Sequence, residues 1–348
     1  MTAEPVGEDL PAPPPPDGGA PRIVVFAPSP VLTVTVEDHP EEPDIHVHAG
    51  GQGIWQARML LGLGIRVSMC SVLSGEAGRI LRHLIADEGI DLHAIERSGR
   101  GAAYVHDRRG GAREAIAESG GEPLTRHDVD ELYGLMLREG LEAGTAILSG
   151  PAGEDALPAD VYRRLAADLR TNGARVIVDL AGERLAAALE GGVDVAKVSH
   201  EELLADGRIE KEEPRQIISA MREMAEQGAS AVIVTRAGEP FLVYAEGTVQ
   251  EVRMPKLEIA DPKGAGDSLT AGVAAALAEG SDIWEAVCTG AAAGALNVTR
   301  HGLGTGEREA IAKLRELVVC RPTDGSPEAT DAEEAVSPQQ LARRVVDR

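Results

Sequence analysis

The sequence predicts an α/β fold in which helices flank a central, mostly parallel sheet and a small β-sheet forms a lid. Three observations support this fold class. Short runs rich in Val and Ile alternate along the chain with segments of helical periodicity. Each run is almost continuously apolar, which is typical of strands that helices cover on both faces. Two pairs of strand-like segments interrupt this alternation and indicate a second, smaller sheet.

The elements of the core follow from these patterns in chain order. The apolar runs predict strands at residues 22–27, 66–72, 146–149, 175–179, 193–198 and 231–235. Helical periodicity predicts helices at residues 52–63, 78–88, 127–142, 159–172 and 214–227. The Ala- and Gly-rich stretch at 264–298 predicts two further long helices, and residues 307–318 predict another. Parallel strands need crossover connections, so these helices should lie on both faces of the sheet.

The lid is expected from two segments that lack helices. Residues 31–48 predict two strands around an acidic, Pro-containing loop, and residues 102–118 predict a hairpin that turns at 108–111. We expect these β pairs to cover the open face of the core, with the lid formed from about residues 31–48 and 100–118. The exposed face of such a sheet would suit a homodimer through the lid. A hairpin that only decorates the core is the alternative.

Composition and charge limit the classes of function. The 348 residues include 34 Lys and Arg against 57 Asp and Glu, which gives a formal charge of −23. An acidic chain is a poor nucleic-acid binder, because that binding needs basic side chains that displace counterions from phosphates. No apolar run approaches the ~18 residues of a membrane-spanning helix, and no signal peptide opens the chain. We therefore expect a cytoplasmic protein with no nucleic-acid or membrane partner.

The two ends of the chain differ in composition from its centre. Residues 1–21 contain four consecutive prolines and predict a disordered, Pro-rich tail. Residues 321–348 are acidic and predict a second disordered tail, which leaves residues 22–320 as the folded domain. The three cysteines, Cys70, Cys288 and Cys320, show no CxxC spacing. This argues against a disulfide framework and against a cysteine-rich zinc site.

The string DPKGAGDS, at residues 261–268, carries the chemistry. Small residues at a helix start let a ligand approach the backbone, and the free N–H groups and the helix dipole form a pocket for an anion. Asp267, in the first turn of that helix, would direct a carboxylate into the pocket. Such a site suits phosphoryl transfer, in which amides stabilise the moving phosphoryl group and the carboxylate accepts an alcohol proton. An ordinary helix start with a capping Asp is the alternative for this string alone.

This string and four others, in the same order along the chain, resemble the ribokinase-like (PfkB) carbohydrate kinases. The family signature DTxGAGDxxxxG is matched from Asp261 to Gly272, with Pro262 where Thr is usual. The family's glycine-rich signature is matched by GGQGIWQARMLLGLG at 50–64. SGP at 149–151, KVSHEEL at 197–203 and VTRAG at 234–238 fall where other family motifs lie. The resemblance covers about residues 22–320, implies a ribokinase-like fold and is greatest to the phosphofructokinase and tagatose-phosphate kinase branch.

The resemblance also implies roles for the matched residues. Asp267 matches the base that deprotonates the acceptor hydroxyl, and Glu202 matches a Glu that holds Mg²⁺ through water. Arg100 matches an Arg that binds the substrate phosphate, to which a guanidinium donates two parallel bonds. Other positions match the anion hole for the γ-phosphoryl group of ATP (Gly264, Ala265 and Gly266), the ATP contacts (Thr235, Ala237, Gly238 and Asn297) and the substrate loop (Gly50, Gly51, Gln52 and Gly53).

Besides Pro262, four positions depart from the family pattern, and three of these four lie on the acceptor side. Val31 or Thr33, depending on the alignment, replaces the family's sugar-binding Asp. Gln52 and Trp55 stand where Lys and Asn are usual, and Ser199 replaces the Asn of the KPN string. Trp55 is expected either in the core or against the acceptor. An enzyme selects its acceptor largely through buried hydrogen bonds, and these substitutions change the side chains that could make them. They therefore predict an altered acceptor pocket.

Together these features predict an ATP- and Mg²⁺-dependent kinase that phosphorylates a hydroxyl of a sugar phosphate, with Asp267 as general base. A kinase for a non-phosphorylated sugar or nucleoside, and a catalytically silent nucleotide-binding regulatory protein, are the alternatives. His39, His46 and His48 could indicate a metal site, but solvated lid histidines are the simpler interpretation. The chain has no GxxxxGK[ST] string and no GxGxxG after its first strand, which argues against a P-loop ATPase and a Rossmann dehydrogenase.

Overall fold

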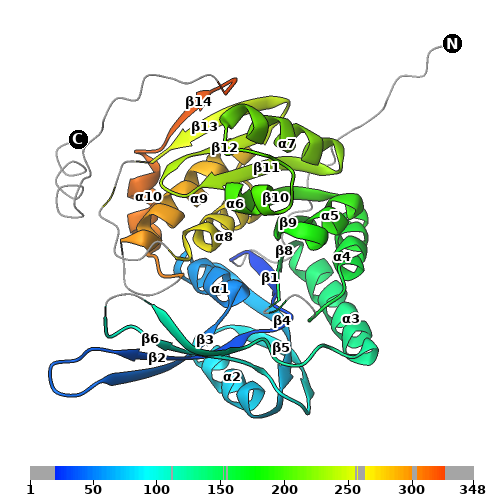
Figure 1. The fold of residues 1–348 in the computed structure, drawn as a ribbon. Helices are drawn as coiled ribbons and strands as arrows, with labels where there is room; N and C mark the ends of the chain where they lie inside the picture. The colour runs from blue at the N-terminus through cyan, green and yellow to red at the C-terminus, as the bar shows by residue number, and fades with distance from the viewer. Residues whose placement is uncertain are drawn as a thin grey trace.

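Two β-sheets organise the chain (Figure 1). The computed structural model describes residues 20–110, 113–151, 153, 156–254, 257, 263–299 and 304–325. The strands of the large sheet are β1 (Arg22–Phe26), β4 (Arg66–Ser74), β5 (Asp91–Arg97), β8 (Thr145–Ser149), β9 (Arg175–Asp179), β10 (Val193–Ser199), β11 (Ala229–Arg236), β12 (Glu239–Ala245), β13 (Thr248–Arg253) and β14 (Val319–Pro322). Their order across the sheet is β14-β13-β12-β11-β10-β9-β8-β1-β4-β5.

The large sheet is mostly parallel, as the apolar runs predict. All neighbouring strands from β5 to β11 pair in parallel, and only β12, β13 and β14 join antiparallel at one edge. Apart from β5 at the edge, the parallel strands are buried along most of their length, because helices cover both faces. This covering explains why their sequences are continuously apolar rather than alternating.

Ten helices among the described residues form the outer layers. Their bounds are α1 (Gln52–Gly62), α2 (Gly75–Asp87), α3 (Arg126–Ala143), α4 (Asp160–Thr171), α5 (Gly182–Gly191), α6 (His200–Ala205), α7 (Pro214–Glu226), α8 (Ala265–Ala278), α9 (Ile283–Val298) and α10 (Arg308–Arg315). One hydrophobic core joins the sheet to α1, α2, α8, α9 and α10. A second core joins the other face to α3, α4, α5, α6 and α7. None of the described helices is long and apolar enough to cross a membrane.

The smaller sheet is the predicted lid. It contains β2 (Val31–Glu37), β3 (Asp44–Gly50), β6 (Ala102–Asp107) and β7 (Glu114–Ser119), in the order β3-β2-β6-β7. β2 pairs in parallel with β6, whereas β3 and β7 pair antiparallel with their neighbours. In Figure 1 this sheet lies beside α1 and α2, at one end of the central sheet. The strands expected at 31–48 and the hairpin expected at 102–118 therefore form one sheet.

Some elements are absent from the sequence prediction. The sequence does not predict six of the observed elements, which are β5, β12, β13, β14, α5 and α6. The end of β9 at Asp179 agrees with the predicted strand. β14 pairs with β13 as far as Pro322. Ordered structure therefore continues past residue 320, where the sequence predicts the start of a disordered tail. The rest of the expected tail, and residues 1–19, lie outside the described residues.

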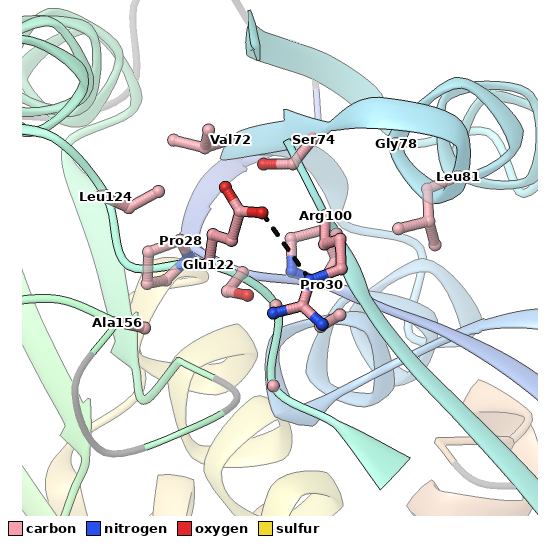
Figure 2. A pocket seen from close by; sticks show the side chains of 15 residues that line it. Pro28, Pro30, Val72, Ser74, Gly78, Leu81, Arg100, Glu122, Leu124 and Ala156 are labelled. Atoms are coloured by element: carbon pink, nitrogen blue, oxygen red, sulfur yellow. Dashed lines mark ion pairs between the residues drawn. The ribbon is translucent and has the colours of Figure 1, made fainter. Parts of the chain in front are cut away.

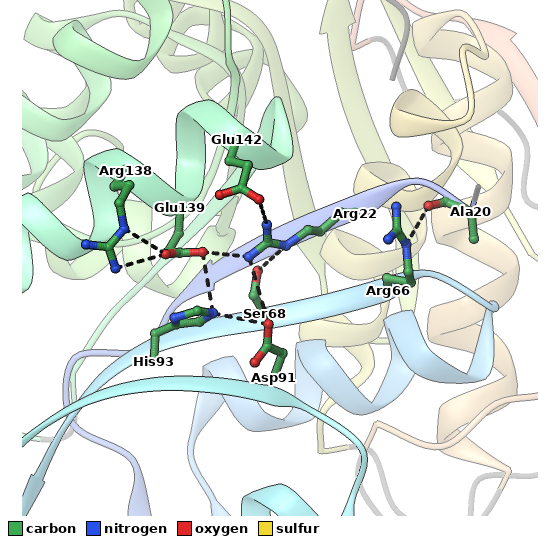
Figure 3. Close-up of polar contacts among 9 residues, drawn as sticks. All are labelled: Ala20, Arg22, Arg66, Ser68, Asp91, His93, Arg138, Glu139 and Glu142. Carbon is green, nitrogen blue, oxygen red and sulfur yellow. Dashed lines mark hydrogen bonds and ion pairs between the residues drawn. The ribbon is translucent and has the colours of Figure 1, made fainter. Parts of the chain in front are cut away.

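A network of ion pairs closes the amino ends of β1, β4 and β5 (Figure 3). Arg22 donates to Glu139 at 2.6 Å and to the hydroxyl of Ser68 at 3.1 Å. Glu139, on α3, is 97% buried and also lies 3.4 Å from His93. A buried carboxylate needs such partners, because its desolvation would otherwise oppose folding. The network ties α3 to the sheet at the edge opposite to the site described next, and we assign it a structural role.

Candidate active site

Residues 263–268 of the predicted catalytic string lie at the edge of the sheet where the parallel strands end, and Asp261 and Pro262 lie outside the described residues. Ser149, Asp179 and Lys197, near the carboxyl ends of β8, β9 and β10, are direct neighbours in register: Ser149 pairs with Asp179, and Lys197 pairs with Asp179. Paired residues of adjacent strands point to the same face of a sheet. Their polar groups therefore converge beneath the start of α8, at the edge where α/β proteins bind ligands.

Helix α8 begins in a way that leaves room for an anion. Gly264 is its N-cap residue with a φ of 75°, in the left-handed region that glycine adopts without strain. A Cβ on Gly266 would lie 2.8 Å from Nζ of Lys197, so glycine lets this ammonium group approach the first turn. The positive end of the helix dipole and the ammonium group both favour a bound anion.

Asp267 belongs to a group of charges that we call the base cluster, composed of the buried residues Asp179, Lys197 and Asp267 and the half-buried Glu202. Lys197 Nζ donates to Asp179 Oδ1 at 2.9 Å, and both residues are almost fully buried. Thr270 Oγ1 of α8 donates to the second oxygen of Asp179 at 2.9 Å. Asp179 therefore anchors both Lys197 and helix α8, which fixes the position of Asp267 one turn before Thr270.

The environment of Asp267 suits a group that exchanges protons near neutral pH. Burial and the charge of Asp179 raise the pKa of Asp267 to about 7, although Lys197 and a hydrogen bond from Gln52 oppose this increase. A base is most effective when its pKa lies near the working pH. Burial alone would lower the pKa of Lys197, but the carboxylates of Asp179 and Asp267 raise it above its usual value. Lys197 therefore stays charged beside the anion pocket.

A cavity of about 200 Å³ lies next to the base cluster. Its lining is formed by the end of β1 and the following loop, the start of α1, the lid and the end of β8 (Ala27, Ser29, Pro30, Val31, Gly50, Gly51, Gln52, Gly53, Ile54, Tyr104, Gly150 and Pro151). All four predicted substrate-loop residues are in this lining. Gln52 joins the cavity to Asp267, because its Oε1 accepts from the Gly150 N–H at 2.9 Å while its side chain hydrogen-bonds Asp267. Among the described residues the lining contains no charged side chain.

Arg100 lies in a second hollow beside this cavity (Figure 2). The two hollows share Ser29 and Pro30. The Arg100 side chain is 78% exposed, and its Nε lies 3.7 Å from Oε1 of Glu122. Such an exposed pair contributes little stability, so a phosphate group could replace Glu122 at small cost. The structure does not bring Arg100 into the cavity lining, and its contact with substrate stays a prediction.

The predicted ATP residues lie on two parts of the fold. Thr235 is near the end of β11, and Ala237 and Gly238 form the turn into β12, where Ala237 has a φ of 49°. His200 of α6 contacts the carbonyl of Thr235 at 3.2 Å, which ties this turn to the end of β10. Thr235 therefore lies at the same sheet edge as the base cluster, but contact of these three residues with ATP stays a prediction.

Asn297 is the fourth predicted ATP residue and is buried in α9. Its Nδ2 donates to the carbonyl of Lys263 at 2.7 Å, and its Oδ1 accepts from the N–H of Gly304 at 2.9 Å. Both ends of the amide are thus used to hold backbone next to the anion pocket. This contact gives Asn297 a positioning role in the structure, and a direct bond to nucleotide stays a prediction.

Glu202 and Ser199 form a capping box at the start of α6. The Ser199 N–H donates to Glu202 Oε2 at 2.7 Å, and the Glu202 N–H donates to Ser199 Oγ at 3.2 Å. Ser and Asn are both good N-cap residues, so Ser199 can replace the family's Asn without loss of the helix start. The Glu202 charge raises the pKa of both Lys197 and Asp267, which places its carboxylate at the base cluster.

The structure shows where the residues that differ from the family pattern on the acceptor side lie. Val31 lines the cavity, whereas Thr33 lies behind it against Gly50, so Val31 occupies the cavity wall on this strand. Trp55 packs against the core that α1 shares with α8. Of the two expectations for Trp55, the core position is therefore the one observed. Among these residues, Gln52 contacts both the cavity and Asp267.

Two members of the base cluster were not assigned roles from the sequence. Asp179 ends a predicted apolar strand, and a carboxylate at the carboxyl end of a buried parallel strand is a signal that could have identified it. The sequence identifies Lys197 only as the first residue of the KVSHEEL string. A single sequence does not reveal that Ser149, Asp179 and Lys197 are neighbours in register, because strand order is not local information.

Comparison with known proteins decides the family. The "pfkB family carbohydrate kinase" pattern matches residues 24–310, which is most of the chain. The chain belongs to the PfkB family of carbohydrate kinases. The resemblance found in its five motifs is thereby confirmed, and the protein is a phosphotransferase with an alcohol group as acceptor. Kinases of this family are ATP-dependent and act on a sugar or a sugar phosphate.

Named relatives of this PfkB kinase are distant in sequence. It is 26% identical to the 1-phosphofructokinase of Bacillus subtilis over 260 residues, which is 75% of this chain and 84% of that protein. The tetrameric inhibited form of phosphofructokinase-2 from Escherichia coli superposes with a TM-score of 0.72 at 25% identity, over 85% of this chain and 98% of that one. Arabidopsis thaliana ribokinase, with a TM-score of 0.67 at 22% identity over 86% and 99% of the two chains, confirms the ribokinase-like fold.

Proposed function

We propose that this PfkB kinase transfers the γ-phosphoryl group of ATP to a hydroxyl of a sugar phosphate, with Asp267 as the general base. The observation that carries the proposal is the position of Asp267: it lies in the first turn of α8, beside Lys197, and contacts the Gln52 side chain that lines the cavity. An acceptor in the cavity would release its hydroxyl proton to Asp267. The N–H groups of Gly264, Ala265 and Gly266 would stabilise the transferred phosphoryl group.

Mg²⁺ fits the chemistry of this site. Mg²⁺ prefers carboxylate oxygens and keeps several of its waters, and Glu202 is a half-buried carboxylate with one oxygen fixed by the Ser199 N–H. We therefore assign Glu202 to hold the ion through water, while Lys197 supplies a fixed positive charge beside Gly266. When bound, the ion would neutralise charge on the ATP phosphates.

The phosphate on the acceptor is the part of the proposal that Arg100 supports. Its exposed guanidinium lies beside the cavity, and the 1-phosphofructokinase and phosphofructokinase-2 relatives carry names that refer to phosphorylated fructose. The uncharged cavity lining favours the second candidate, a non-phosphorylated sugar or nucleoside, because a phosphate inside that lining would lack a cation. The two candidates differ only in whether the acceptor reaches Arg100.

The test measures ADP release by the purified chain with ATP and Mg²⁺, across sugar phosphates, free sugars and nucleosides. The Asp267→Ala variant serves as the blank. Release that depends on a phosphorylated ketose and disappears in the variant supports the proposal. Release with neutral acceptors alone replaces the first candidate by the second, and ATP binding without release from any acceptor would contradict both.

The exposed face of the lid supports a homodimer. Ile45 and Val47 of β3 are 63% and 47% exposed, and Ile116 of β7 is 61% exposed. Exposed apolar side chains gathered on one small sheet are typical of a contact surface. Sedimentation velocity should therefore show a dimer that Ile45→Asp dissociates, whereas Leu141→Asp, at a 40% exposed position on α3, should leave it intact. A monomeric parent chain would contradict this assignment.

A further inference from the structure

Two of the three cysteines lie together, far along the chain from one another and outside the catalytic string. Cys288 is on α9 and Cys320 is on β14, and their Sγ atoms are 3.5 Å apart, at hydrogen-bond distance for thiols. Both side chains are partly exposed, so small solutes can reach them. Cys70, in β4, is fully buried and provides an internal comparison.

The two thiols of the pair differ in acidity. The hydrogen bond from Cys320 lowers the pKa of Cys288 to about 7; burial and the charges of Asp282 and Glu285 oppose this, and Arg315 adds to it. The same bond raises the pKa of Cys320. Cys288 is therefore present in part as the thiolate near neutral pH, and only the thiolate is nucleophilic.

The pair also joins helix α9 to the strand β14. β14 is the edge strand of the large sheet, and Cys320 lies opposite Val252 of β13. The segment between the two cysteines contains the end of α9 and the whole of α10. It includes Asn297, whose amide holds the backbone of Lys263 and Gly304 beside the anion pocket.

We propose that Cys288 and Cys320 form a redox-active dithiol, a modification site that reacts with small disulfides and closes to an intramolecular disulfide. The Cys288 thiolate attacks a disulfide RSSR, which forms a mixed disulfide and releases RS⁻. The Cys320 thiol then loses its proton and attacks the Cys288 sulfur, which forms the Cys288–Cys320 bond and releases the second RS⁻. Two protein thiols are oxidised, one RSSR is reduced to two RSH, and the proton from each cysteine ends on an RS⁻.

Closure would tie the edge strand β14 to α9 and so fix the segment around Asn297. A single reversible pair of this kind is compatible with a cytoplasmic chain that lacks a disulfide framework, because cytoplasmic disulfides are transient and redox-sensing. The proposal does not depend on the acceptor or on Asp267, so its test is independent of the kinase assay.

The experiment treats the full chain with oxidised glutathione near neutral pH, followed by intact mass and peptide mapping without reduction. The parent chain should lose two hydrogen atoms, give one cross-linked peptide that joins residues 288 and 320, and gain about 5 °C in Tm. Cys320→Ser should stop at a glutathione adduct on Cys288. Cys70→Ser should behave as the parent, and peptide mapping of the parent reports the pairing even if that variant does not fold.

Three results would overturn the proposal. The first is a parent chain in which alkylation shows both thiols still reduced under conditions that oxidise a small reference dithiol. The second is a cross-linked peptide that contains Cys70. The third is a disulfide between two chains as the main product.

Discussion

Replacing Asp267 by Asn should stabilise the folded chain, and by more at high pH than at low pH. Burial and Asp179 raise the pKa of Asp267 from 3.8 to about 7 in the folded state. Between these two values the folded chain holds a proton that the unfolded chain has released. The free energy of unfolding of the parent therefore falls as the pH rises through this window, whereas the amide side chain of the Asp267→Asn variant does not titrate.

The size of the effect follows from the same values. For one group with these two pKa values, the parent loses about 2.5 kcal/mol of stability between about pH 5 and about pH 8. The base cluster shares its charges, so we expect the stability difference between variant and parent to grow by about 2 kcal/mol over this range.

Urea unfolding at both pH values measures the difference directly, because the titration of groups outside the base cluster cancels between parent and variant. Asp130→Asn, at an exposed position on α3, is the matched control and should change stability by less than about 0.5 kcal/mol at either pH. A stability difference for Asp267→Asn that is equal at both pH values, or larger at the lower one, would show that the pKa of Asp267 is not raised in the folded chain.

Three further predictions concern the acceptor site and the packing of the core. Arg100→Ala should raise KM for a phosphorylated acceptor about tenfold and change KM for a neutral acceptor less than about twofold; equal changes in steady-state assays would exclude a phosphate contact. Gln52→Leu should move the acidic limb of the kcat/KM pH profile to higher pH, because the Gln52 hydrogen bond lowers the pKa of Asp267; an unmoved limb would contradict this. Gly290→Ala should lower the free energy of unfolding by about 1–3 kcal/mol in denaturant titrations, since its Cβ would lie 2.6 Å from a Val273 methyl group. The control for Gly290→Ala is Gly134→Ala, at an open position in α3, which should instead raise the free energy of unfolding by about 0.5–1 kcal/mol.

The sequence predicts the parallel core because each buried strand has its own local pattern of apolar residues. Strands covered on both faces are continuously apolar, so β1, β4, β8, β9, β10 and β11 could be located from their composition alone. β12 and β13 form an antiparallel hairpin around a short turn, and β14, the strand at the edge of the sheet, is four residues long with a mostly exposed pattern. β13 and β14 lack a continuous apolar run, and the pairing of β14 with β13 joins segments that lie far apart in the chain.

The candidate site, like the sheet, is predicted from the sequence only where neighbouring residues encode it. Asp267 and the small residues before it were predicted, because a helix start with its own anion pocket is encoded in neighbouring residues. Asp179 and Lys197 belong to the site because β9 and β10 are neighbours in the sheet, and the sequence does not show this pairing. The Gln52 hydrogen bonds with Gly150 and Asp267 join residues far apart in the chain, so the link between cavity and base required the structure.

The role of Asp267 as general base is tested most directly by two measurements on the same samples of the parent and Asp267→Asn. One is the kcat for acceptor-dependent ADP release, and the other is the Kd for ATP by titration calorimetry. The kcat should fall by at least about 10²-fold, because a positioned base contributes about that factor or more, while Kd should change by less than about threefold. An Asn variant that keeps more than about a tenth of the parent kcat would contradict the assignment of Asp267 as the base.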